Sequence, residues 1–182
     1  VYDRDETLLM SNTTGKMKFN SNQAIRKANV HMTGDRRGSI STGANQVFRD
    51  QLVGYTFLSG TYSTLGEGRN LSLTLDADVC VAANEALYGR RGTVGVYNYK
   101  TGEIICLVSS PNYDPTNPPT LPSDDKSGTY LNRFFSSRFS PGSIFKLVTA
   151  AASIETKSDY DTWEYQCTGR LDYGTVDKVT CT

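Results

Sequence analysis

Histidine is nearly absent from this chain of 182 residues, and neither sign of charge is in excess. His31 is the single histidine, and the four cysteines are not spaced as zinc ligands are, so we expect no metal site and no other cofactor. The 19 basic side chains balance 19 acidic ones, which argues against a nucleic-acid partner. No stretch approaches the roughly 20 consecutive apolar residues of a membrane span. These absences leave a chain long enough for one domain with a sizeable core, or one domain plus an accessory piece.

The cysteines divide into two pairs with different expectations. Cys80 and Cys106 fall in a predicted helix and a predicted strand, where a buried free thiol is the ordinary state. Cys167 and Cys181 flank a short glycine-containing segment and would pair in an oxidising compartment. The sequence leaves open whether they do.

Periodicity and turn residues predict an alternation of short helices and strands. The clearest signal is a hairpin of two strands, 93–99 and 103–109, joined at Lys100-Thr101-Gly102. Its second strand is apolar without alternation, which predicts a central strand covered on both faces. The other expected elements are strands over 1–10 and 70–75, and helices over 22–27, 44–53, from Asp76 to Gly89, and 130–135.

Three further stretches carry side chains that invite a functional reading. His31 stands beside Val30 and Met32 with no nucleophile tied to it, so a packed structural residue is favoured over a catalytic base. Arg36, Arg37 and Gly38 read as a solvated basic turn. Five of the six prolines lie between residues 110 and 128, which predicts a surface loop, with a role as a rim of the substrate cleft as a second reading.

The stretch from Phe139 to Lys157 carries the strongest chemical signal. After Pro141-Gly142 the sequence is apolar on nearly every side of a helix except for Lys146, and such a helix is expected to be buried. Ser143 and Lys146 are three residues apart, so they share one face of that helix. A buried lysine amine, whose pKa falls from its usual value of about 10.4, can take the proton of a serine hydroxyl and activate it as a nucleophile. Backbone N–H groups at the helix start would hold the developing oxyanion.

The pattern Ser-x-x-Lys is weak by itself, because chance alone gives roughly one such pair in a chain of this composition. A second pair, Ser123 and Lys126, lies in the polar proline-rich segment, where Asp124 and Asp125 would keep the lysine protonated. We interpret that pair as the chance match. For Ser143 the residues alone leave a second interpretation open, a capping serine after a Pro-Gly turn.

Several stretches resemble the first half of the transpeptidase domain of a penicillin-binding protein, a family that carries Ser-x-x-Lys with later Ser-x-Asn and Lys-Thr-Gly elements. The opening VYDRDETLL is similar to the segment that follows the membrane anchor in the monofunctional, class B members. The resembling stretches are NYKTGEIICLVSSPNYDP (98–115), LNRFF (131–135), SPGSIFKLVTAAASIE (140–155) and, more weakly, VHMTGDRRGSISTGANQVFRDQLVGY (30–55).

The resemblance implies an α+β fold: a partial transpeptidase (β-lactamase-like) domain with an antiparallel sheet flanked by helices. It implies an N-terminal pedestal or linker segment over 1–60 and the first half of the transpeptidase domain over 61–182. Lys100-Thr101-Gly102 and Ser110-Pro111-Asn112 spell catalytic elements of the family, but they precede Ser143 instead of following it. We therefore assign them no catalytic role, and we expect the 182 residues alone to be inactive.

By the same resemblance, the full-length protein is a peptidoglycan D,D-transpeptidase that forms a serine acyl-enzyme through Ser143, with Lys146 as the base. Its partners would be peptidoglycan stem peptides, β-lactam antibiotics and other cell-wall synthesis proteins. The chain begins at Val1, so the resemblance places a membrane anchor ahead of it and the protein on the extracytoplasmic face of the bacterial membrane. Two alternatives remain: a β-lactam-hydrolysing or sensing relative, and a non-catalytic scaffold fragment of the cell-wall machinery.

Overall fold

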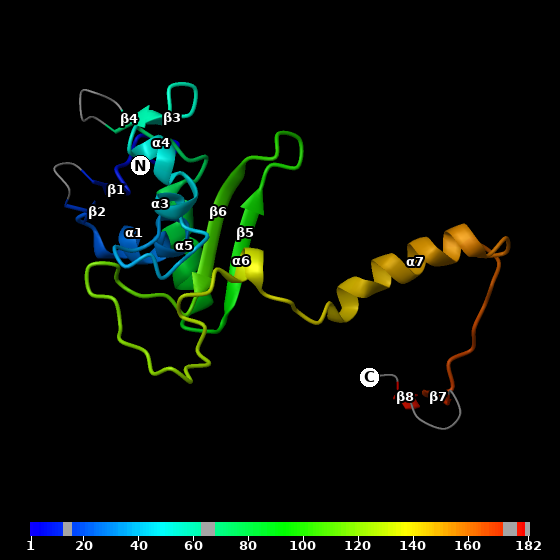
Figure 1. The fold of residues 1–182 in the computed structure, drawn as a ribbon. Coiled ribbons are helices and arrows are strands. Elements are labelled where there is room, and N and C mark those ends of the chain that lie inside the picture. The colour runs from blue at the N-terminus through cyan, green and yellow to red at the C-terminus, as the bar shows by residue number, and fades with distance from the viewer. Residues whose placement is uncertain (13–15, 63–67, 173–177, 181–182) are drawn as a thin grey trace. The chain divides into compact units, whose positions relative to one another are not determined.

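The computed structural model describes residues 1–12, 16–62, 68–172 and 178–180. It divides into two compact units, Val1–Arg138 (unit 1) and Phe139–Thr182 (unit 2). Short helices and antiparallel strand pairs alternate along the chain, in agreement with the predicted α+β class (Figure 1). Among the described residues, no helix has both the length and the apolar character that a bilayer crossing needs.

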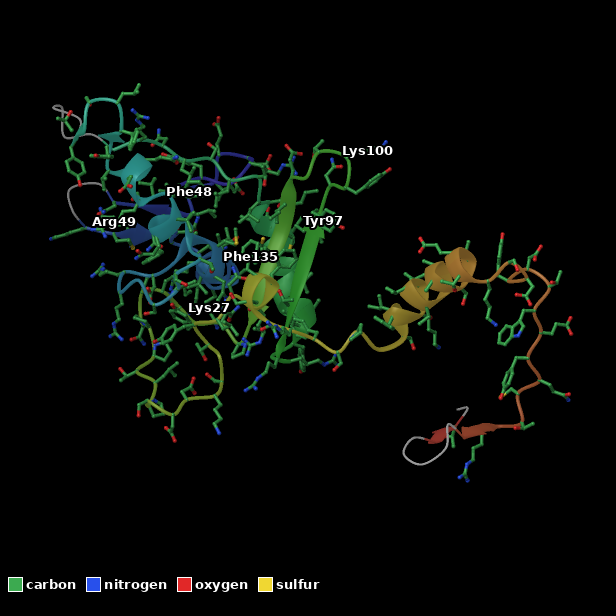
Figure 2. All side chains as sticks on the ribbon, turned by 45° about the vertical axis from the view of Figure 1, so that its right-hand side comes forward. Lys27, Phe48, Arg49, Tyr97, Lys100 and Phe135 are labelled. Atoms are coloured by element: carbon green, nitrogen blue, oxygen red, sulfur yellow. The ribbon has the colours of Figure 1, made fainter. Side chains whose placement is uncertain are left out.

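The β5–β6 hairpin is the longest strand pair of unit 1. Strand β5 (Gly92–Tyr97) runs antiparallel to β6 (Ile104–Ser110), with Gly92 opposite Ser110, which confirms the predicted hairpin. Its turn carries Lys100 beyond Tyr97 (Figure 2). Gly102 has a φ of +78°, a conformation that glycine adopts at little cost, and its N–H donates to the Asn98 carbonyl at 2.7 Å.

Helix α5 (Ala77–Leu87) packs against β6 and forms the main core with it. It begins as predicted, because the Asp76 carboxylate caps the helix by accepting the N–H groups of residues 78 and 79. Cys80 and Cys106 are fully buried in this core and are free thiols, as predicted; the hydrogen bond between the two thiols, together with burial, raises the pKa of Cys80. Consecutive residues of β6 are buried, so both faces of this strand are covered, as predicted. The prediction that β6 is a central strand is not met within the described residues, because β6 pairs there only with β5.

The N-terminal part of unit 1 is built from short pieces. The predicted helix over 44–53 is wrong as a single element, because Phe48 leaves helical geometry (φ −106°, ψ 22°) and splits it. The strands expected over 1–10 and 70–75 reduce to isolated bridges, Tyr2 with Leu8 and with Ser72. The elements are β1 (Met10–Ser11), β2 (Lys18–Phe19), α1 (Gln23–Ala28), α2 (Val30–Thr33), α3 (Ala44–Val47), α4 (Arg49–Leu52), β3 (Tyr55–Thr56) and β4 (Thr61–Tyr62).

The proline-rich segment is a loop, as predicted, but side chains hold it to the body of unit 1. Tyr113 is buried and its hydroxyl donates to the Asp35 carboxylate at 3.0 Å. Arg26 of α1 forms a two-point ion pair with Asp114, with Nη2 to Oδ2 at 2.7 Å and Nε to Oδ1 at 2.8 Å. The Arg26 guanidinium holds the pKa of the Asp114 carboxyl well below its usual range. Charge-assisted two-point pairs of this kind are geometrically specific, so the start of the loop has a fixed position.

Unit 2 contains a 3₁₀ turn η2 (Gly142–Ile144), helix α7 (Phe145–Thr156) and the strand pair β7 (Arg170–Asp172) and β8 (Lys178–Thr180). Trp163 and Tyr165 stack on each other at 6.2 Å between ring centroids while remaining half exposed. The Lys157 ammonium lies 4.1 Å from the Trp163 ring centroid. Cys181 lies outside the described residues, so its pairing with Cys167 stays a prediction.

Candidate active site

Ser143 and Lys146 stand on one continuous helical stretch, as the spacing predicts. The stretch begins at Pro141, whose carbonyl accepts the Ile144 N–H at 3.2 Å, and passes from η2 into α7 with helical backbone angles at residues 144 and 145. Gly142 has a φ of +54°, which a side chain would disfavour, so the Pro-Gly pair sets the turn that starts the helix. The serine and the lysine are therefore one helical turn apart.

The second Ser-x-x-Lys pair has a different local structure. Ser123 lies in a turn in which the Asp125 N–H donates to the Pro122 carbonyl at 3.1 Å, and no helix includes Ser123 or Lys126. Without a helix, the three-residue spacing does not place the two side chains on one face. The structure thus distinguishes the two sequence matches on local geometry alone.

The expected burial of the Ser143 helix is not found. Helix α7 has no buried residue, and even large apolar side chains such as Ile144 (73% exposed) and Leu147 (74% exposed) face solvent, as do Ser143 and Lys146. Among the described residues, no hydrogen bond joins Ser143 Oγ to Lys146 Nζ. An apolar sequence shows that a helix needs a covering surface, and the described residues of unit 2 do not supply one for α7.

The segment that leads to the motif is anchored by polar side chains that the sequence reasoning missed. Helix α6 (Arg133–Ser136) lies within the predicted helix 130–135, and the residues there that are almost fully buried are Asn132 and Arg133. Asn132 caps α6 by accepting the Phe134 N–H at 3.2 Å, and it donates to the His31 carbonyl at 3.3 Å.

Arg133 closes the loop that precedes α6. Its guanidinium donates to the carbonyls of Gly128 at 2.8 Å and Ser127 at 2.6 Å. Its backbone N–H donates to the hydroxyl of Ser109 at 3.0 Å, which ties α6 to strand β6. A Cβ on Gly95 of β5 would lie 2.2 Å from the Phe134 ring, so a glycine there allows α6 to approach the sheet. The signal available in the sequence was the unusual position of an arginine inside an otherwise apolar helix stretch.

His31 is a buried structural residue, as the sequence favoured. Its side chain is fully buried, and Nε2 lies 2.9 Å from the Thr129 carbonyl. Since a carbonyl only accepts, Nε2 carries a proton, while Nδ1 has no hydrogen-bond partner among the described residues. Burial lowers the pKa of His31 to about 4, and the positive charge of Arg133 adds to the effect against the opposing Thr129 hydrogen bond.

This depressed pKa predicts a pH dependence of stability. As the pH falls below about 6.5, His31 takes a proton in the unfolded chain but not in the folded one until about pH 4, so stability is lost across that window. The contribution of His31 to the free energy of unfolding should fall by about 2 kcal/mol between pH 7.5 and pH 5.0. Urea unfolding at the two pH values measures it.

The control for the His31 prediction is His31→Phe, which cannot titrate. The variant should be less stable at pH 7.5, because the hydrogen bond to Thr129 is lost, but it should lose about 2 kcal/mol less than the wild type on acidification. If the free energy of unfolding fell equally with pH in wild type and in His31→Phe, His31 would have the same pKa in the folded and unfolded chains. That result would contradict its burial.

The two stretches that spell later catalytic elements are structural in this chain. Lys100-Thr101-Gly102 forms the exposed turn of the β5–β6 hairpin. Asn112 donates to the Asn84 side chain of α5 at 2.5 Å, which holds the end of β6 to that helix. Within the part of the chain that the structure describes, no group of three His, Cys, Asp or Glu side chains is arranged to hold a metal ion.

Comparison with known proteins agrees with the resemblance seen in the sequence. Residues 92–180 match the family described as penicillin binding protein transpeptidase domain. A curated relative, the peptidoglycan D,D-transpeptidase PbpA of Mycolicibacterium smegmatis, is 33% identical over 104 residues, which cover 48% of this chain and 21% of the relative. The chain therefore spans about a fifth of that relative's length.

Solved structures share the fold. Pseudomonas aeruginosa PBP2 in complex with WCK 5153 matches with a TM-score of 0.73 at 21% identity, over 98% of this chain and 44% of that one. Penicillin-binding protein A of M. tuberculosis, solved as an imipenem acyl-enzyme complex, matches with a TM-score of 0.71 at 20% identity, over 96% of this chain and 46% of that one. The predicted fold, a partial transpeptidase domain, is confirmed by these matches.

Proposed function

We propose that the full-length protein is a class B-like peptidoglycan D,D-transpeptidase, because residues 92–180 match the family described as penicillin binding protein transpeptidase domain. The observation that carries the site assignment is the placement of Ser143 and Lys146 one helical turn apart, directly after a Pro-Gly turn. The alternative pair at Ser123 lacks that geometry.

In the proposed reaction, Ser143 Oγ attacks the carbonyl carbon of the penultimate D-alanine of a stem peptide while Lys146 Nζ takes the hydroxyl proton. The tetrahedral intermediate collapses, the bond to the last D-alanine breaks, and that residue leaves as an amine that has received the proton. An amine of a neighbouring strand then attacks the serine ester, forms the cross-link and restores the hydroxyl. A β-lactam acylates the same oxygen because its strained amide stands in for the peptide bond.

This chemistry requires an unprotonated lysine amine shielded from water, and the described residues leave Lys146 exposed. We therefore propose that the active state covers helix α7 with further polypeptide of the transpeptidase domain. Within this proposal, residues 1–60 are a pedestal and residues 61–182 are the first half of that domain. The protein acts on the extracytoplasmic face of the membrane, held by an anchor.

The test is to locate the β-lactam adduct by mass spectrometry in the full-length protein. Trypsin cleavage after Arg138 and Lys146 releases the peptide 139–146, which contains Ser140 and Ser143, and fragment ions separate the two serines. We expect one penicilloyl group on Ser143 that persists for hours, as a transpeptidase requires and a β-lactam-hydrolysing relative would not allow. An adduct on the peptide containing Ser123 would overturn the assignment of the serine, and no adduct on any serine would favour a scaffold role.

A further inference from the structure

A hollow of about 930 Å³ in unit 1 is lined by four arginines, Arg36, Arg37, Arg49 and Arg69. From the sequence alone, Arg36 and Arg37 are expected in a solvated turn. In the structure they share one cavity with an arginine of helix α4, labelled in Figure 2, and with one that follows the β3–β4 hairpin. The basic turn is therefore one part of a larger positively charged surface that the sequence does not reveal.

Hydrogen bonds to backbone carbonyls place two of these arginines beside the hollow. The Arg36 guanidinium donates to the Met17 carbonyl at 3.0 Å. The Arg69 N–H donates to the Leu52 carbonyl at 3.2 Å, at the end of α4. A Cβ on Gly68 would lie 2.0 Å from the same carbonyl, so glycine permits the close approach that brings Arg69 beside α4. The convergence of the charges follows from the fold.

No carboxylate compensates these charges within the described residues. None of the four arginines forms an ion pair there, and no described residue that lines the hollow is acidic. Asp35, next to Arg36 in sequence, is buried and accepts from the Ser39 N–H and the Tyr113 hydroxyl instead. Since the whole chain has no net charge, the four arginines are a local concentration of positive charge among the described residues that line the hollow, and a bound anion would reduce their mutual repulsion.

We propose that this hollow binds a ligand that carries a diphosphate group. Guanidinium groups donate two parallel hydrogen bonds to phosphate oxygens, and a diphosphate concentrates several negative charges on two adjacent phosphates, so it offsets most of the charge of the four arginines. Gln46 and Asn70, which also line the hollow, supply neutral amide donors. The volume lies within the range of small-molecule sites, larger than a bare diphosphate needs and large enough for an attached organic group.

The test is calorimetric titration of the full-length protein with inorganic pyrophosphate at low salt. Wild type should bind it saturably with a stoichiometry of one, and Arg36→Gln/Arg37→Gln should weaken binding by at least about 30-fold, because each charged hydrogen bond contributes roughly 1.5–3 kcal/mol. Arg90→Gln/Arg91→Gln is the matched control: an exposed arginine pair of unit 1 outside the hollow, which should leave the affinity unchanged.

Three outcomes would overturn the proposal: no saturable pyrophosphate binding, an equal loss in the control pair, or equally tight binding of citrate, a carboxylate of similar charge. Thermal unfolding of each variant separates lost binding from lost folding, and a single change, Arg49→Gln, tests the site if the double variant is unstable.

A second experiment, vesicle co-sedimentation, distinguishes a lipid-linked diphosphate from a soluble one. Co-sedimentation with phosphatidylcholine vesicles that contain geranylgeranyl diphosphate indicates a lipid-linked ligand, whereas binding to soluble pyrophosphate alone indicates a soluble one.

Discussion

Replacing Ser143 by alanine removes covalent labelling of the full-length protein by a fluorescent penicillin. The loss should be at least about 10³-fold, because deleting a nucleophile leaves no atom that can form the acyl bond. In the chain of residues 1–182, Ser143 is exposed and its hydroxyl makes no hydrogen bond among the described residues, so the free energy of unfolding of this chain should change by no more than about 0.5 kcal/mol. Gel fluorescence and urea unfolding measure the two quantities.

The chain contains its own control for this prediction. Ser123→Ala removes the serine of the second Ser-x-x-Lys pair, which lies in an exposed turn, and should label like the wild type. If Ser143→Ala kept substantial labelling with an unchanged fold, the acyl-enzyme proposal would have to be abandoned. If Ser123→Ala lost it, the site would have to be moved to the proline-rich loop.

Replacing Lys146 by alanine should slow acylation by about 10²–10⁴-fold while leaving Ser143 in place. A general base acts by accepting a proton, so Lys146→Arg should be equally impaired, because a guanidinium stays protonated although it keeps the positive charge. The measurement is the second-order rate constant of acylation between pH 5.5 and pH 9. Wild type should show a rising limb that both variants lack.

Lys126→Ala is the matched control for Lys146 and should keep the wild-type rate and pH profile. A Lys146→Arg variant with half the wild-type rate would show that the position needs only a positive charge, which contradicts the role of base. The chain of residues 1–182 alone should acylate at least about 10²-fold more slowly than the full-length protein, because water solvates the amine on exposed α7.

Local chemistry made part of the structure predictable. The Asp76 cap of α5, the hairpin turn at Lys100–Gly102 and the helical start at Pro141-Gly142 all depend on a few neighbouring residues, and all three are found as expected. The single helix expected over 44–53 and the docking of α6 through its phenylalanines depend on packing instead. The single helix was wrong, because Phe48 interrupts it, whereas the Phe134 ring does lie against Gly95 of β5 and Arg133 is the more deeply buried residue of α6.

For the candidate site, the sequence by itself determined the spacing of Ser143 and Lys146 and the turn that places them on one helical face, since i and i+3 geometry is a property of the helix alone. It could not determine the exposure of α7, the burial of His31 and Arg133, or the meeting of Arg36, Arg37, Arg49 and Arg69 around one hollow. Burial and convergence of charge join residues far apart in the chain, so only the tertiary structure decided them.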